Sequence, residues 1–199
     1  MKTLLASAAL VGLVAAPAVH AEIWQIDPSH TEVVASWDHV GFSRQSLKFH
    51  AAEGQLDFTP GNPEGASAEF SILVDSVDTG VEMLDNELKG ETFFHSAEYP
   101  RVTFVSTEVE QTGDMTLRVT GNLTVKDITA PATFDVTVNA IGDHPLADFF
   151  DVYQGDFLGL TATATVSRSE FGLGALAMTA SDEIEIVINT EMKAGGFPG

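Results

Sequence analysis

The sequence predicts an all-β protein whose antiparallel strands either close into a barrel or stack as a two-sheet sandwich. Residues 114–140 alternate apolar and polar side chains almost without error, the same alternation recurs along the chain, and only one stretch has helical spacing. Alternation places successive side chains on opposite faces of a strand. Each of these segments therefore has one apolar face that the fold must cover.

The expected strands follow one another with short connections. A short N-terminal strand at 23–26 precedes alternating segments at 31–38, 47–58, 68–74 and 102–109. Residues 114–140 form two neighbouring strands with a turn expected over Asp127–Pro131, and segments at 158–166 and 184–192 follow. The total is eight or nine strands joined largely as hairpins.

Residues 79–88 are the helical exception. Thr79 and Glu82 fit a capping box, and Met83, Leu84 and Leu88 lie on one helical side. A short turn over 91–94 is expected next, and Tyr99-Pro100 ends the insert.

Strand length favours the barrel over the sandwich. A run of about twelve residues spans about 40 Å, and a barrel of about eight strands is either filled by side chains or holds one small ligand. The apolar face of 158–166 includes Ala162 and Ala164, which fill little space, but alanines opposite Trp37 or a phenylalanine would also fit a close-packed core. Periodicity therefore leaves cavity and packed core equally open.

Residues 1–21 read as a cleaved secretory signal, with Lys2, an apolar run over 4–14 and the small residue Ala21 at the cleavage site. The domain organisation is then a signal peptide (1–21), a barrel (22–192) and a flexible C-terminal tail (193–199). Neither the short signal nor any later segment predicts a membrane span. An exported chain without cysteines fits the periplasm.

Charge and composition exclude several functions. Lys2 is the one charged residue of the signal, so the mature chain carries 29 acidic against 8 basic side chains, which makes nucleic acid an implausible partner. The absence of cysteine excludes thiol catalysis and cysteine metal sites. No metal-binding HExxH, nucleophile elbow or phosphate loop occurs. A metal or acid/base cluster of His30 and His39 with Asp27 or Asp38 is disfavoured, because the two histidines would point to opposite faces of an unbroken strand. No catalytic residue, metal site or cofactor is therefore assigned.

Ordered motifs make the chain resemble the YceI-like family of periplasmic polyisoprenoid-binding proteins from about Ile23 to Met192. The motifs are WQIDPSH at 24–30, HVGFS at 39–43, SVDT at 76–79, Leu88 with Phe93-Phe94, YPRVTF at 99–104, GNLTV at 121–125, SRSEFG at 167–172 and DEI at 182–184.

The resemblance implies an elongated, eight-stranded, lipocalin-like antiparallel barrel with a short helical insert. It also implies a non-catalytic role, in which the interior holds an isoprenoid quinone or polyprenyl lipid for transport, storage or stress response. Transient contact with a membrane fits this role, and pairing of two barrels as a homodimer is left open. The expected lining is Trp37, Phe49, Phe58, Phe70, Ile72, Phe104, Leu117, Val119, Phe134, Val136, Leu160, Ala162, Ala164 and Ile186, with Phe93 and Phe94 as a lid.

Departures from the family pattern bear on the ligand's head group. Residues 84–88 lack the family's arginine and histidine, Leu47 replaces a glycine, and Ala130 replaces a lysine. With the acidic net charge, these losses favour a neutral head group such as a quinone over a diphosphate. Two alternatives stay open: an interaction module with a filled barrel, and a lipid-acting enzyme using Asp27, His30, His39 or Arg168 near the mouth.

Overall fold

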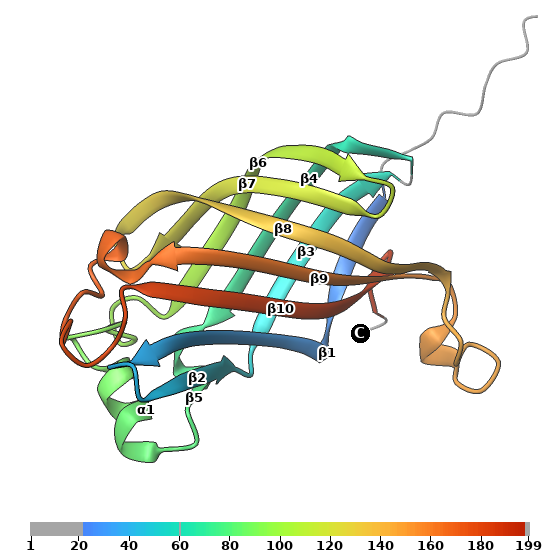
Figure 1. Cartoon of the computed structure of the whole chain (residues 1–199). Coiled ribbons are helices and arrows are strands. Elements are labelled where there is room, and N and C mark those ends of the chain that lie inside the picture. The colour runs from blue at the N-terminus through green and yellow to red at the C-terminus, as the bar shows by residue number, and fades with distance from the viewer. Residues whose placement is uncertain (1–21, 60, 198–199) are drawn as a thin grey trace, which may run out of the picture.

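The computed structural model describes residues 22–59 and 61–197, so the expected signal peptide lies outside the described residues. These residues form ten strand segments and one short α-helix (Figure 1). The strands are β1 (Glu22–His39), β2 (Ser43–Phe49), β3 (Ala52–Thr59), β4 (Asn62–Leu73), β5 (Val77–Asp78), β6 (Arg101–Gly113), β7 (Thr116–Val125), β8 (Ile128–Asp143), β9 (Asp156–Ser167) and β10 (Glu183–Ala194).

The ten segments make eight barrel strands. β2 and β3 both pair antiparallel with β1 and are separated only by residues 50–51, while β4 and β5 are separated by a 3-10 turn at Val74–Ser76. The order runs from β10 through β9, β8, β7, β6, β4 and β3 to β1, and β1 pairs again with β10. The sheet is therefore a closed, all-antiparallel barrel, as predicted, and closure removes the free edges of a sandwich.

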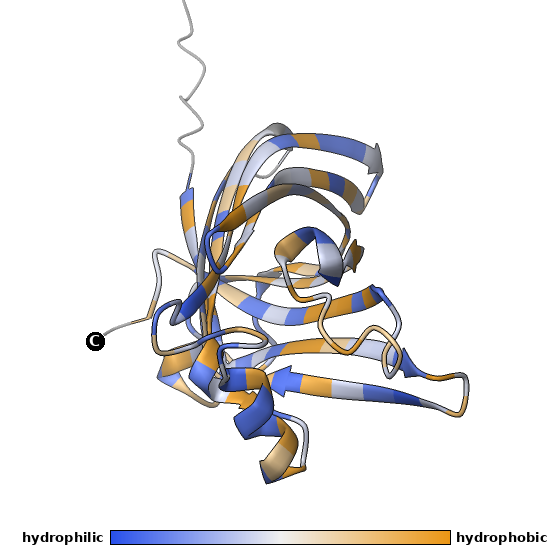
Figure 2. Ribbon diagram, turned by 90° about the vertical axis from the view of Figure 1, so that its left-hand side faces the viewer, coloured by the Kyte–Doolittle hydropathy of each residue, from blue (hydrophilic) through white to orange (hydrophobic). Residues whose placement is uncertain are grey.

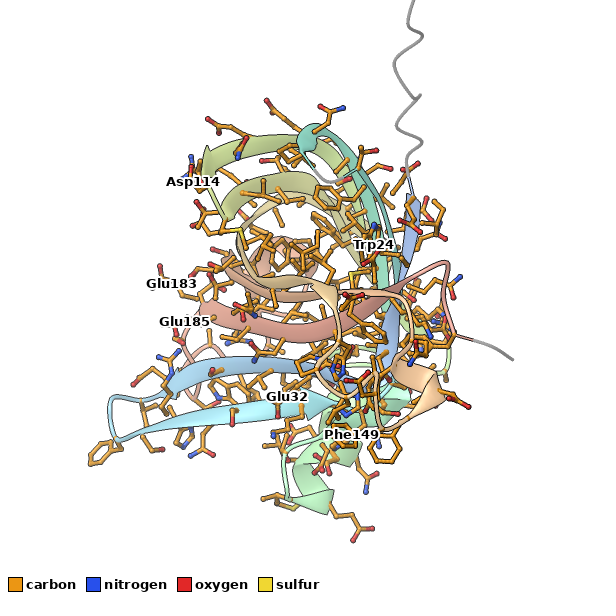
Figure 3. The ribbon with its side chains drawn as sticks, turned by 90° about the vertical axis from the view of Figure 1, so that its right-hand side faces the viewer. Trp24, Glu32, Asp114, Phe149, Glu183 and Glu185 are labelled. Atoms are coloured by element: carbon orange, nitrogen blue, oxygen red, sulfur yellow. The ribbon has the colours of Figure 1, made fainter. Side chains whose placement is uncertain are left out.

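Alternation along each strand sorts side chains between the interior and solvent. Apolar and polar bands alternate along the ribbons in Figure 2. Trp24 is 1% exposed and its indole Nε1 donates to the Phe58 carbonyl at 3.2 Å. The acidic side chains Glu32, Asp114, Glu183 and Glu185 project outward from the ribbon in Figure 3.

The hairpin between β7 and β8 is tighter than expected. The turn comprises Lys126 and Asp127, with Lys126 at φ 57°, and β8 runs on through Pro131, which pairs with Asn122. The expected turn over Asp127–Pro131 is therefore wrong in its extent. Proline is accommodated because β9 joins β8 only from Asp135 onward, which leaves an unpaired side for a residue that lacks an N–H.

The helix α1 (Glu82–Lys89) forms where expected, but without the expected capping box. Val81 is the N-cap and supplies no side-chain hydrogen bond. Instead, Asp85 Oδ1 accepts from the Thr79 backbone N–H and hydroxyl, each at 2.7 Å. Asp85 can reach back because the chain before the helix folds over its first turn.

The C-terminal boundary of the barrel lies beyond the expected Met192. Lys193 and Ala194 belong to β10, Lys193 is 9% exposed, and the ring of Phe197 lies 6.2 Å from that of Phe157. Residues 193 and 194, which were expected to belong to the tail, are therefore part of the last strand. Pairing with Gln25 and Phe157 holds Lys193 in the sheet.

Gly121 in β7 allows the sheet to approach the ring of Phe104. A Cβ at this position would lie 2.4 Å from the Val105 carbonyl oxygen and 2.5 Å from the Phe104 ring. We expect Gly121→Ala to destabilise the protein by about 1–3 kcal/mol through overpacking. Gly159→Ala is the matched control, because a Cβ there meets nothing closer than 3.7 Å. Urea unfolding of both variants checks this, and equal midpoints would contradict it.

Candidate ligand-binding site

The barrel encloses an apolar cavity of about 660 Å³. Every barrel strand contributes to its wall, so the inward faces of strands far apart in sequence converge on one space. The edge-to-face pair of Phe104 and Phe134, with ring centroids 5.0 Å apart, contributes to this wall. Cavities of this size enclose most of a drug-sized ligand.

The structure places nearly all of the expected lining residues on this cavity. Trp37, Phe49, Phe58, Phe70, Ile72, Phe104, Leu117, Val119, Phe134, Val136, Leu160, Ala162 and Ile186 line it, as do Phe93 and Phe94. Ala164 does not, although it is half-buried against the same apolar core. Several further residues with the same strand parity line the cavity but were not among the expected ones: Val33, Leu47, Leu123, Val125, Val138 and Ile188.

The cavity reaches the surface at the end of the barrel that carries α1. Its lining there includes His39, Gln45, Glu87, Leu176 and Thr179, and all five of these residues are exposed. They come from the β1–β2 hairpin, from α1 and from the segment 172–182, which lie at the same end in Figure 1. This mouth therefore carries exposed polar side chains beside Leu176 and leads into an apolar interior.

Phe93 and Phe94, the expected lid, line the cavity. Both are half-buried, and the Phe94 ring contacts Phe49 edge-to-face with centroids 5.9 Å apart. The segment 172–182, which we call the mouth loop, also lines the cavity, through Leu173, Leu176, Thr179 and Ala180. The mouth loop was not predicted from the sequence, because residues 172–182 have no secondary-structure periodicity.

Arg168 shapes the mouth loop from within. It is 8% exposed, and its guanidinium donates to the backbone carbonyls of Leu173, Ala175 (2.8 Å), Ser181 (2.9 Å) and Ala180 (3.2 Å). These hydrogen bonds occupy the guanidinium N–H groups with which Arg168 would otherwise bind a reacting group or an anionic ligand. Arg168 therefore acts as the anchor of the loop.

Asp182 fixes the other end of the mouth loop. Its carboxylate accepts from the Ser169 hydroxyl at 2.7 Å and the Ser169 backbone N–H at 2.9 Å, which lowers the pKa of Asp182 below its usual 3.8. A carboxyl group whose pKa is lower in the folded chain than in the unfolded chain stabilises the fold at pH values above its unfolded pKa. This stabilisation is lost as the pH falls through the folded pKa. We expect Asp182→Asn to lower the urea midpoint at pH 7, with the difference from the parent shrinking below about pH 4. A difference independent of pH would contradict this.

The residues considered for catalysis do not converge. His30 Nδ1 lies 2.8 Å from Asp27 Oδ2, but both lie at the kink of β1, whereas His39 and Arg168 lie at the mouth. The hydrogen bond that His30 donates to the Asp27 carboxylate raises the pKa of His30. Burial of Asp27 opposes its ionisation, yet hydrogen bonds from His30 and Ser29 outweigh this effect and lower its pKa. Neither group lines the cavity.

Within residues 22–59 and 61–197, no helix is long and apolar enough to cross a membrane. A closed antiparallel barrel around an apolar cavity defines the class of ligand-binding β-barrels. A model described as a YceI-like domain matches residues 24–192, and the chain belongs to that family. It is 31% identical over 153 residues to Protein YceI of Salmonella arizonae, covering 77% of this chain and 76% of that protein.

Solved structures share the fold. Burkholderia cenocepacia BcnA superposes with a TM-score of 0.73 at 25% identity, covering 83% of this chain and 98% of that one. The Campylobacter jejuni YCEI protein has a TM-score of 0.68 at 24% identity, covering 77% and 87%. A polyisoprenoid binding domain from Saccharophagus degradans has a TM-score of 0.62 at 12% identity, covering 86% and 98%.

Proposed function

We propose that this protein is a non-catalytic periplasmic carrier that holds the tail of an isoprenoid lipid in its barrel. The observation that carries the proposal is the continuous apolar cavity of about 660 Å³, which opens at the end of the barrel that carries α1. A barrel filled by its own side chains would leave no such space. Burial of a hydrocarbon tail at about 25 cal/mol per Å² drives binding from water. The name of the Saccharophagus degradans domain is consistent with this ligand class.

A neutral head group, such as a quinone, suits the mouth better than a diphosphate. Glu87 lies at the mouth, where it would repel an anion, and the Arg168 donors bind backbone carbonyls. The excess of acidic residues adds long-range repulsion.

Lipid extraction tests the carrier role directly. The mature chain is purified from periplasm without detergent and extracted with organic solvent, and the extract is analysed by mass spectrometry. We expect about one isoprenoid lipid per protein with an uncharged head group. A polyprenyl diphosphate would overturn the head-group assignment. No lipid, together with failure to take up added quinone, would overturn the carrier role.

Apolar side chains around the mouth support transient contact with a membrane during loading. Six exposed residues form this mouth rim: Val40, Phe42, Val81, Met83, Leu176 and Met178. Phe42 is 90% exposed and Met178 is 89% exposed. Apolar side chains at one end can enter the interface of a bilayer, while the acidic surface would disfavour anionic lipids. A lipid could then pass from membrane to cavity without crossing water.

Weakening the mouth rim is expected to slow lipid transfer. We expect the double variant Phe42→Ser, Met178→Ser to slow quinone transfer between phosphatidylcholine vesicles about fivefold, with binding stoichiometry unchanged. Phe149→Ser, Phe150→Ser is the matched control, because these residues are also exposed but belong to the β8–β9 loop, which lies at the other end of the barrel (Figure 1). Equal slowing in both variants would argue against a specific role of the rim.

A further inference from the structure

A second cluster of titratable side chains lies on the outside of the barrel, away from the mouth. It joins the kink of β1 to β10 and to the β8–β9 loop (residues 144–155). Thr190 and Met192 line the cavity, so Glu191 between them points outward. The cluster is therefore separate from the proposed lipid site.

Three ligand atoms converge in this cluster. Asp27 Oδ2, His30 Nδ1 and Glu191 Oε2 all lie within 4.8 Å of one another. His30 Nδ1 is 2.8 Å from Asp27 Oδ2 and 3.9 Å from Glu191 Oε2. The donor atoms of a tetrahedral zinc ion, each about 2.1 Å from the metal, lie about 3.4 Å apart, between these two distances.

Glu191 supplies an independent indication that a cation belongs here. Its Oε2 atom is buried and has no hydrogen-bond partner among the described residues, although the side chain as a whole is 37% exposed. A buried carboxylate oxygen without a donor is unfavourable unless a positive charge compensates it. His30 Nδ1 is already engaged by Asp27.

His144 approaches Glu191 from the loop side. Its Nε2 lies 3.7 Å from Glu191 Oε2, while its Nδ1 accepts from the Leu146 backbone N–H at 3.1 Å. Neutral His144 therefore carries its proton on Nε2, facing Glu191. Such a group can orient a ligand carboxylate without binding the metal itself. Stacking on Tyr153, with ring centroids 4.2 Å apart, holds the imidazole in place.

We propose that Asp27, His30 and Glu191 bind a divalent transition-metal ion such as Zn²⁺, with water completing the coordination. The ion would replace the proton between His30 Nδ1 and Asp27 Oδ2, and this proton would be released to solvent. One imidazole and two carboxylates are ligands that Zn²⁺ accepts. The ion would compensate the orphaned oxygen and join β1 to β10 beneath the β8–β9 loop. His144 is a positioning residue for Glu191.

Calorimetric titration with ZnCl₂ tests the proposal on the mature chain, treated with chelator and purified without a polyhistidine tag. We expect one site in the parent protein and an increase in thermal midpoint on zinc addition. Glu191→Gln should abolish this site, and His144→Gln should weaken it about tenfold. Circular dichroism shows whether each variant is folded.

The exposed pair of His50 and Asp78 provides the matched control, since its Nε2–Oδ2 distance is 3.0 Å but no third ligand among the described residues joins it. His50→Asn should bind zinc like the parent. Cobalt(II) gives a second readout, because its visible absorption reports the geometry of the bound ion. Absence of a zinc site in the parent, or unchanged binding by folded Glu191→Gln, would overturn the proposal.

Discussion

Replacement of Arg168 by methionine is expected to lower the free energy of unfolding by about 3–5 kcal/mol. The substitution removes four hydrogen bonds at once and leaves carbonyls of the mouth loop without their buried donor. Leu173 and Leu176 line the cavity from this loop, so a bound lipid should also dissociate faster. Urea unfolding at neutral pH, with the slope compared between variants, measures the stability effect.

Arg44→Met is the control for loss of an arginine as such. Arg44 is paired with Glu185 on the surface, where both side chains are more than half exposed. Exposed ion pairs contribute at most about 1 kcal/mol. Arg168→Lys separates charge from geometry, because lysine keeps the charge but lacks the planar fork of donors. A loss in Arg168→Met no larger than in Arg44→Met would show that Arg168 does not anchor the loop.

Filling the cavity from β9 is expected to weaken lipid binding at least about tenfold. Ala162 lines the cavity between Val136 on β8 and Ile188 on β10, so Ala162→Phe places a ring where the tail would lie. Titration with a water-dispersed quinone, followed by quenching of tryptophan fluorescence, measures the affinity. Trp37 lines the cavity and makes this readout local.

Thr163→Phe is the matched control, because Thr163 is the next residue on the same strand and is exposed on the outer face. It adds the same ring without entering the cavity, so its affinity should equal that of the parent. Folding of Ala162→Phe is checked by circular dichroism and urea unfolding. Unchanged affinity in a folded Ala162→Phe would show that the lipid does not occupy this cavity.

Residue pattern alone predicted much of the fold and most of the cavity wall. The alternation over 114–140 predicted β7 and β8, and the same parity placed Leu117, Val119, Phe134 and Val136 on the inner face. This succeeds because the two-residue period of a strand is a local property. Turn chemistry was less reliable: the pattern misplaced the β7–β8 turn and the cap of α1.

Whether the inner faces enclose a cavity or pack on one another was decided only by the tertiary structure. Barrel closure depends on the pairing of β1 with β10. In this pairing Trp24 of β1 lies opposite Ala194 of β10, which is distant from it in sequence. Ala162 and Ala164 are the same residue type and have the same parity, yet of the two only Ala162 lines the cavity.

The mouth and the outer cluster likewise depend on contacts between distant segments. Arg168 organises a loop without periodicity, and Glu191 meets Asp27 and His30 only because β10 closes the barrel against β1. Local pattern therefore determined the strands and their apolar faces. Closure of the sheet determined the cavity, its mouth and the neighbours of each polar group, because these rest on long-range pairing that no short stretch of sequence encodes.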